Sequence, residues 1–126
     1  VRDTGRVKLF KSYRDDVADG EQKRDFVYVR DAGAMMLHLA FSDAAGLFNI
    51  GSGRAETWLE LADAVFAAMG REPNIEFIEM PESMRAKYQY YTRADISRVR
   101  AAGFDSGLTP LAEAVKETVE SLSAED

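Results

Sequence analysis

Two glycines flank a serine at positions 51–53, between the apolar stretch "LFNI" at 47–50 and a segment with helical periodicity. A strand, a glycine-rich turn and a helix in this order are typical of loops that bind the phosphates of a dinucleotide. Glu79 ends the next predicted strand at about the spacing expected of an acid that binds the ribose. A cofactor loop is therefore the first hypothesis that these residues raise.

The residues after the turn argue against that hypothesis. The dinucleotide fingerprint needs a third glycine for close packing of helix on strand, and Glu56 occupies that position. Thr57 and Glu60 form a capping-box pattern, whose side chains bind the first backbone amides of the helix. A phosphate would need those amides free, and Glu56 would add negative charge beside it. We favour a tight strand-to-helix turn at 51–53.

No catalytic constellation is evident in the sequence. A Ser/His/Asp hydrolase would need His38 as its base, but His38 lies inside "MMLHLAF", where a core or helix-edge histidine is expected. Asp15 and Asp16 are adjacent in a polar stretch, where solvated carboxylates are expected. No tyrosine is followed by a lysine four residues later, so the catalytic pair of short-chain dehydrogenases is absent. We therefore predict no catalytic residue in this chain.

Three groups of basic and aromatic side chains suit an anionic ligand better. They are Lys23 and Arg24 in "QKRDF", Arg85, Lys87, Tyr88, Tyr90 and Tyr91 in "RAKYQYYT", and Phe10 and Tyr13 in "KLFKSY". A guanidinium can bind a phosphate through two hydrogen bonds, and a flat ring can stack on a base. Each group alone is more simply a solvated charge or a half-buried ring. Together, near predicted strand ends, they favour a nucleotide ligand.

The elements that must position these groups alternate along the chain. Strands are predicted at 6–10, 25–29, 47–50 and 74–80, and 12–22 reads as an exposed loop. Helices are predicted at 32–42, from the Thr57 cap to Gly70, at 93–102, and from Thr109-Pro110 to about Leu122. Asp31 and Thr92 are the expected caps of the first and third helices. The first helix is apolar nearly all round, which predicts burial on most sides. The alternation predicts an α/β fold, mostly parallel.

Composition excludes several classes of protein. With 126 residues, the chain is expected to form one domain over 1–126. Its net charge of −6 argues against non-specific binding to nucleic acid or to an anionic membrane. The absence of cysteine and the single histidine leave too few ligands for an ordinary transition-metal site. No signal-peptide pattern and no run of about 18 apolar residues occur, so a cytoplasmic location is expected.

The order of three motifs carries a family resemblance. "QKRDFVYVRD" at 22–31 resembles the strand–helix signature in the C-terminal part of extended short-chain dehydrogenases, which include nucleotide-sugar epimerases and dehydratases. "FNIGSGRAETWLELADAV" at 48–65 and "KYQYYTRADISRVRAAGF" at 87–104 resemble the following segments of that family. With "KLFKS" and "GSGRAE" added, almost the whole chain most closely resembles the C-terminal portion of the ADP-heptose 6-epimerase family. The start at Val1, without a methionine, also suggests a portion of a longer protein.

The resemblance implies a substrate-binding part of an extended short-chain dehydrogenase whose Rossmann half is missing. The family's NADP, glycine-rich loop and catalytic Tyr and Lys belong to the upstream half, so no cofactor is expected here. Phe10, Lys11, Ser12 and Tyr13 match the segment that lines the nucleotide, Arg24 the arginine near the diphosphate, and Tyr88 a tyrosine that contacts substrate. The expected ligand is ADP-heptose, and the expected whole enzyme is a homo-oligomer. Two alternatives stay open, another nucleotide-sugar epimerase or dehydratase and a stand-alone binding module.

Overall fold

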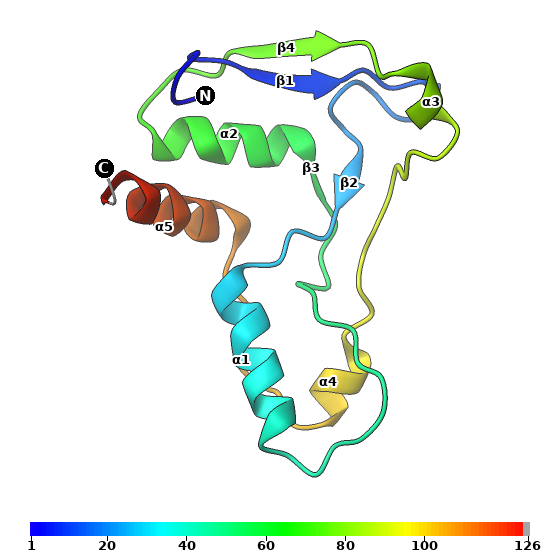
Figure 1. Ribbon diagram of the computed structural model, residues 1–126, viewed down its shortest axis with the longest axis vertical. Coiled ribbons are helices and arrows are strands. Elements are labelled where there is room, and N and C mark those ends of the chain that lie inside the picture. Colours follow the sequence, from blue (N-terminus) through cyan, green and yellow to red (C-terminus); the bar gives the residue numbers. More distant parts are fainter. Residues whose placement is uncertain (125–126) are drawn as a thin grey trace.

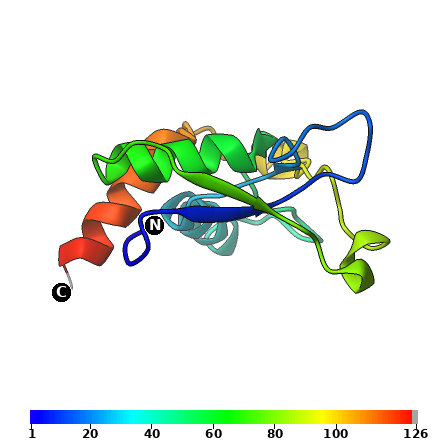
Figure 2. The same ribbon diagram turned by 90° about the horizontal axis from the view of Figure 1, so that it is seen from above.

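Two short apolar segments form the main sheet. Strand β1 (Val7–Phe10) pairs in parallel with strand β4 (Ile75–Ile78), with Val7 opposite Ile75 and Phe10 opposite Ile78. The computed structural model describes residues 1–124 and confirms both strands, which the sequence predicted at 6–10 and 74–80. The carboxyl ends of both strands point to the same end of the molecule, where the loop 11–22 and helix α3 (Glu82–Arg85) lie (Figure 2).

Helix α2 (Trp58–Ala68) begins where the sequence predicts. The Glu60 amide donates to the Thr57 hydroxyl at 3.0 Å, and the Glu60 carboxylate accepts from the Thr57 amide at 2.5 Å. Gly70 follows the helix with a φ of +61°, a conformation that favours glycine, and ends it as predicted. The first hydrogen-bond donors of this helix are therefore satisfied by the capping box.

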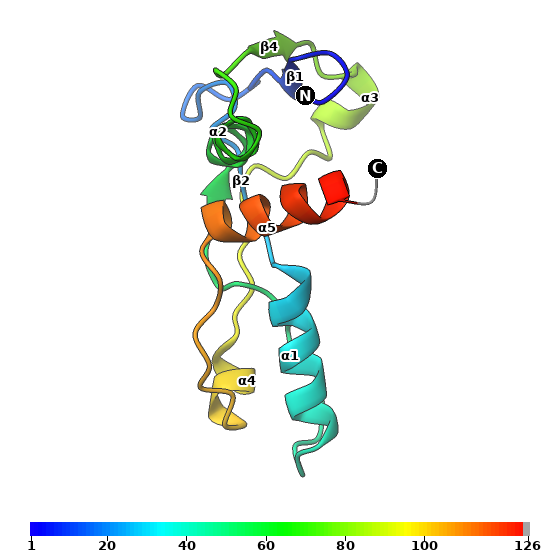
Figure 3. The same ribbon diagram turned by 90° about the vertical axis from the view of Figure 1, so that its left-hand side faces the viewer.

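Helix α5 (Leu111–Ala124) starts directly after the Thr109-Pro110 pair, as predicted. It lies on one side of α2, while the β1–β4 sheet lies on the other side (Figures 1 and 3). The buried side chains in this half of the molecule include Leu9, Ala62, Phe66 and Ala114. Strand, helix and second helix thus form three layers that hold the carboxyl ends of β1 and β4 in place.

The other half of the molecule is built on helices α1 (Val29–Ala40) and α4 (Ser97–Ala101). Its core is Met35, Val99 and Phe104, against which partly buried apolar residues pack. The His38 ring contacts Phe104 edge-on, and its Nε2 lies 2.9 Å from the Ala102 carbonyl oxygen. His38 is therefore a helix-edge histidine of this core, in agreement with the expectation from sequence.

Extended segments join the two halves (Figure 1). Strand β2 (Lys23–Arg24) pairs antiparallel with strand β3 (Glu56–Thr57), and a parallel bridge joins Lys23 to Tyr91. β2 thus lies between the chain at 56–57 and the chain at 91. This pairing brings the "QKRDF" and "RAKYQYYT" segments together, although about 60 residues separate them in sequence.

Two predicted strands and two predicted caps are wrong. The strand predicted at 25–29 does not form, and the strand in this part of the chain is Lys23–Arg24. The residues at 47–50 form no strand with any part of 1–124. Tyr28 is the N-cap residue of α1, while the Asp31 carboxylate binds Thr109 through its amide at 2.8 Å and its hydroxyl at 2.9 Å. The third helix, predicted at 93–102, covers only 97–101. Thr92 does not cap this helix, and its hydroxyl lies 3.4 Å from the Asp25 amide.

The prediction that the first helix is buried on most sides is also wrong. Met35 is its one buried residue, and Val29, Met36 and Leu37 are exposed. Phe41, directly after the helix, is 89% exposed. None of the helices within the described residues has the length and apolar character needed to cross a membrane.

Candidate functional site

The six residues predicted from sequence to bind a ligand lie around the carboxyl ends of β1 and β4. Ligands of open α/β sheets bind at this edge, because the loops that follow parallel strands meet there. Phe10 ends β1, and Lys11, Ser12 and Tyr13 follow it directly. Arg24 comes from β2, and Tyr88 from the segment after α3. Segments far apart in sequence therefore converge on one end of the sheet.

Three of the six residues contact one another directly. The Arg24 guanidinium carbon lies 5.0 Å from the centre of the Tyr88 ring, a cation–π contact. The Phe10 ring contacts the Tyr88 ring edge-on, with ring centres 6.3 Å apart. The Tyr90 ring also contacts the Tyr88 ring edge-on, with ring centres 5.4 Å apart. One Arg24 nitrogen donates to the Lys23 carbonyl oxygen at 2.7 Å. The Tyr88 ring thus packs against the Arg24 guanidinium and is itself packed between Phe10 and Tyr90.

A small cavity of about 280 Å³ opens beside this group. Its lining residues are Arg24, Ser83, Met84, Lys87, Tyr88 and Gln89. Within residues 1–124, no carboxylate lies at ion-pair distance from Arg24 or Lys87. The volume lies at the lower limit of small-molecule pockets, about 300 Å³. A cavity of this size with two unpaired cations suits one charged part of a ligand, such as a diphosphate.

Lys11 and Tyr13 share a carboxylate instead of facing that cavity. The Lys11 ammonium donates to one Glu79 oxygen at 2.6 Å, and the Tyr13 hydroxyl donates to the other. Bonding to Lys11, and then to Tyr13, lowers the pKa of Glu79 from its ordinary value. Glu79 in turn raises the pKa of Lys11 and of Tyr13. The fourth member is Arg85, whose guanidinium lies 3.7 Å from Glu79 and over the Tyr13 ring.

Ser12 lies between these two residues and bonds within its own loop. Its amide donates to the Asp19 carboxylate at 2.6 Å, and its hydroxyl donates to the Arg14 carbonyl oxygen at 3.2 Å. The buried Gln22 side chain donates to the Phe10 carbonyl oxygen at 3.2 Å and fixes the far end of the same loop. The loop expected from sequence at 12–22 is therefore held by hydrogen bonds at several points.

Sequence reasoning missed the role of Glu79. We considered it only as a ribose-binding acid for a glycine loop far along the chain. The available signal was its place directly after one strand, as Lys11 is placed directly after another. Parallel pairing of those two strands makes the two side chains neighbours.

The glycine turn at 51–53 binds an anion that belongs to the protein itself. The Asp25 carboxylate accepts from the Ser52 amide at 2.6 Å and from the Gly53 and Ala94 amides, each at 2.9 Å. Burial alone would raise the pKa of Asp25, but these amide hydrogen bonds outweigh it and lower the pKa. A methyl group on Gly51 would come within 2.4 Å of the Ala94 side chain. The amides that a cofactor phosphate would need are already bound.

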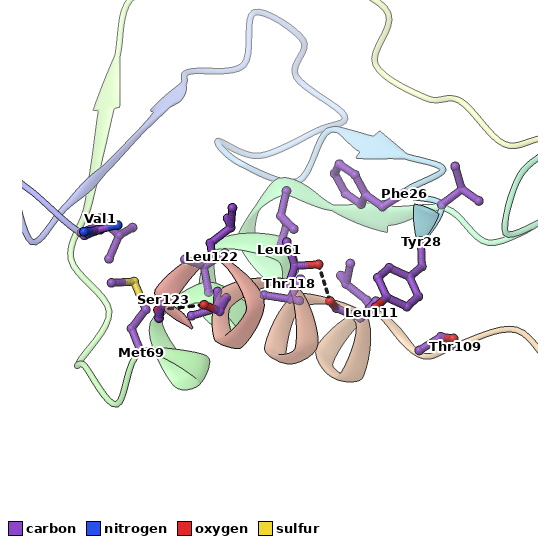
Figure 4. Close-up of a pocket in the computed structure, with 16 residues that line it drawn as sticks. Val1, Phe26, Tyr28, Leu61, Met69, Thr109, Leu111, Thr118, Leu122 and Ser123 are labelled. Carbon is purple, nitrogen blue, oxygen red and sulfur yellow. Dashed lines mark hydrogen bonds between the residues drawn. The ribbon is translucent and has the colours of Figure 1, made fainter. Parts of the chain in front are cut away.

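A larger cavity, of about 790 Å³, lies elsewhere, along the groove between α2 and α5 (Figure 4). Its lining is mainly apolar and includes Leu61, Val65 and Leu122 but none of the six predicted residues. The Thr118 and Ser123 hydroxyls at its wall donate to carbonyl oxygens of their own helix. Its polar side chains are few beside its apolar ones, so this groove suits a nucleotide sugar less well than the cavity beside Arg24 and Lys87. The described residues contain no group of side chains that could hold a metal ion.

Comparison with known proteins identifies the family. No family model matches the chain. An ADP-L-glycero-D-manno-heptose-6-epimerase of Nitratidesulfovibrio vulgaris is 47% identical over 116 residues, which are 91% of this chain and 36% of that protein. The protein of the same name from Fusobacterium nucleatum is 38% identical over 99% of this chain and 40% of its own length. The chain belongs with the C-terminal portions of these epimerases. It spans little more than a third of their length.

Solved structures agree on the fold of this epimerase portion. The ADP-L-glycero-D-manno-heptose-6-epimerase of Helicobacter pylori superposes with a TM-score of 0.77 over 98% of this chain and 35% of that chain, at 23% identity. The UDP-glucose 4-epimerase of Thermus thermophilus, solved with NAD, gives 0.77 over 96% and 36%, at 24% identity. The predicted fold, the C-terminal part of an extended short-chain dehydrogenase without its Rossmann half, is thereby confirmed.

Proposed function

We propose that this chain is the substrate-binding portion of an ADP-heptose 6-epimerase of lipopolysaccharide inner-core biosynthesis. The observation that carries the proposal is the 47% identity to such an enzyme over 91% of the chain. The whole enzyme would invert C6 of the heptose by oxidising it to a carbonyl and returning the hydride. Its cofactor, NADP, would bind to residues outside this chain. A cytoplasmic, homo-oligomeric enzyme is part of the same proposal.

The geometry around Arg24 suggests how a sugar nucleotide would bind. Arg24 and Lys87 would share the diphosphate in the small cavity, because both lack a carboxylate partner in the described part of the chain. Tyr88 would border the sugar side of that diphosphate while holding the guanidinium by its ring. Phe10 and the segment 11–13 would line the nucleotide, and Phe10 and Tyr13 offer flat surfaces for a base.

This chain alone should not epimerise its substrate. It contains no tyrosine with a lysine four residues later and no dinucleotide fingerprint, and its Gly-Ser-Gly turn at 51–53 is bound by Asp25. We expect no turnover of ADP-heptose by the purified chain with NADP present, and no tight binding of NADP. Measurable turnover would contradict this proposal.

Calorimetric titration with ADP, UDP, GDP and dTDP tests the substrate class. We expect weak binding with a preference for ADP, lost by at least about tenfold in Arg24→Ala because a charged hydrogen bond to phosphate is removed. Lys23→Ala is the matched control, since it removes the same charge from the neighbouring position, whose side chain lies on the opposite face of the strand. Equal losses in both variants would indicate a general effect of charge and would contradict the site.

A second candidate is an epimerase or dehydratase for another sugar nucleotide. A UDP-N-acetylglucosamine 4-epimerase of Methanobrevibacter ruminantium has the same fold, with a TM-score of 0.78 over 96% of this chain. Preference for UDP in the titration would favour this candidate. A third candidate is a non-catalytic binding module, which would bind a nucleotide without help from any upstream segment. An upstream-extended chain that gains neither activity nor affinity would favour that alternative.

A further inference from the structure

The carboxylate of Glu79 joins the ends of the two parallel strands. Phe10 is paired with Ile78, so Lys11 and Glu79 are the next residues on neighbouring strands. The Lys11 amide continues the ladder by donating to the Ile78 carbonyl oxygen at 2.9 Å. Above this backbone bond, the Lys11 ammonium and the Tyr13 hydroxyl bind separate oxygens of Glu79. The carboxylate therefore fixes two of the three residues that follow β1.

Contacts run without a gap from this carboxylate to the cavity. The Tyr13 amide donates to the Tyr90 hydroxyl at 2.9 Å. The Tyr90 ring meets the Tyr88 ring, and the Tyr88 ring carries the Arg24 guanidinium. The links are hydrogen bonds, a ring contact and a cation–π contact, and all but the Tyr88–Tyr90 ring contact join segments from different parts of the chain.

Arg85 reinforces the first link. Its guanidinium carbon lies 3.9 Å from the centre of the Tyr13 ring, and its Nε donates to the Met80 carbonyl oxygen at 2.9 Å. The end of α3 is thereby attached to the same ring that binds Glu79. Segments 11–13 and 79–90 move as one unit if these contacts hold.

We propose that Glu79 is a positioning residue of the nucleotide-sugar site, which sets the place of Tyr88 and Arg24 through Tyr13 and Tyr90. The inference rests on the proposed function, because it concerns the same site. Glu79 itself would not touch the diphosphate, since two anions repel. Its role is to hold Lys11, Tyr13 and Arg85 in one arrangement. In the opposite role, Glu79 would compete with the ligand's phosphate for Lys11 and Arg85. Removing the Glu79 charge would weaken ligand binding in the first role and strengthen it in the second.

Titration of ADP into Glu79→Gln separates these two roles. We expect the dissociation constant to rise about five- to tenfold, the size of effect seen between residues of one contact network. Glu76→Gln is the matched control, because Glu76 lies on β4 three residues before Glu79, is partly exposed and also pairs with two cations, Arg6 and Lys8. Both variants change the net charge equally, so only the first should weaken binding. Unchanged or tighter binding by Glu79→Gln would overturn the proposal.

A measurement on the free chain tests the contacts without a ligand. The groups that face Glu79 are Lys11, Tyr13 and Arg85, and Asp19 acts on Lys11 from the loop. Asp16 binds Arg14, whose guanidinium lies over the Tyr90 ring, so acidification also reaches that ring by a second route. By NMR, the Tyr88 and Tyr90 ring signals should shift together on acidification, with a midpoint below the ordinary value of glutamate. The shift should be smaller in Glu79→Gln than in wild type and unchanged in Glu76→Gln, because Glu79 is the carboxylate bonded to Tyr13.

The two measurements separate the possible failures. If the Tyr88 and Tyr90 ring signals depend on pH in the same way in wild type and in Glu79→Gln, the positioning role is overturned, even if ADP binds. If the ring signals change in Glu79→Gln but the chain binds no nucleotide, the proposed function is overturned. Glu79 would then order these side chains without a nucleotide sugar as their ligand. Ring shifts together with weakened ADP binding in Glu79→Gln alone are the result expected.

Discussion

At the scale of single residues, the Asp25 carboxylate joins two segments that are far apart in the sequence. Three backbone amides from two separate segments donate to its carboxylate. We expect Asp25→Asn to lower the free energy of unfolding by about 2–3 kcal/mol. The asparagine NH₂ group cannot accept a hydrogen bond from the backbone amides, and the negative charge is lost. Denaturant unfolding measures the change. Asp63→Asn, on an exposed position of α2, should change stability by less than about 0.5 kcal/mol.

The same carboxylate makes stability depend on pH. Its pKa is lower in the folded chain than in the unfolded chain, where it is about 3.9. The stabilisation is therefore complete above that value and is lost as the pH falls through the folded-state pKa. Thermal unfolding at pH 6 should separate wild type from Asp25→Asn widely, and at pH 3 by less. A gap that stays constant or widens on acidification would contradict this assignment.

The sequence pointed to one group of neighbouring side chains and missed another, for a physical reason. Arg24, Tyr88 and Phe10 were chosen because a cation and flat rings near strand ends suggest a ligand from residue type alone; Tyr88 contacts the other two, and their binding of a ligand stays a prediction. Glu79 was missed because its role depends on the register of β1 against β4, which alternation of apolar residues does not specify across a long crossover. Lys11 and Ser12 were assigned to the ligand, but their described bonds are to Glu79 and within the loop.

At the scale of elements, the start of α2 was predictable because its signal is local. Thr57 and Glu60 are three residues apart and satisfy each other's backbone amides. We expect Thr57→Ala to destabilise the chain by about 1 kcal/mol, and Thr57→Ser, which keeps the oxygen, by much less. Chemical denaturation of the two variants compares them directly. Equal stability of the alanine and serine variants would show that the cap contributes nothing.

The failed strands have the opposite character. Alternation at 25–29 and the short apolar run at 47–50 indicate residues that suit a pleated, half-buried surface, but a strand also needs a neighbouring backbone. Within residues 1–124, Phe48 and Ile50 pack on the α1–α4 core without such a neighbour. The Asn49 side chain donates to the Asp95 carbonyl oxygen at 3.1 Å and holds the segment extended. Asp31, read as a local cap, is likewise used by a distant partner, Thr109.

At the scale of the whole molecule, the α/β alternation was predictable and the division into two halves was not. Each half has its own buried core, and extended segments connect them (Figure 1). Helical periodicity identifies an apolar face but not the element that covers it. The helix at 29–40 therefore looked like a buried helix, although much of its apolar surface is exposed in the described structure.

That exposed surface leads to a prediction about assembly. Val29, Met36, Leu37 and Phe41 recur at spacings that place them on one side of α1, and they are between 56% and 89% exposed. Contiguous apolar patches of this kind are uncommon on soluble monomers and favour association. We expect the purified chain to self-associate as its concentration rises, and Leu37→Lys to shift it towards monomer, because a charge placed in an apolar contact must be desolvated.

Sedimentation velocity over a range of concentrations measures this association. Ser121→Lys provides the control, because it adds the same charge at an exposed polar position of α5, away from the apolar side of α1. It should leave the distribution of species unchanged. A wild-type chain that remains monomeric at every concentration, or a Leu37→Lys chain that associates as strongly as wild type, would exclude this face of α1 as the contact. Loss of association in Leu37→Lys alone would assign the contact to that face, independently of any nucleotide bound at the other end of the molecule.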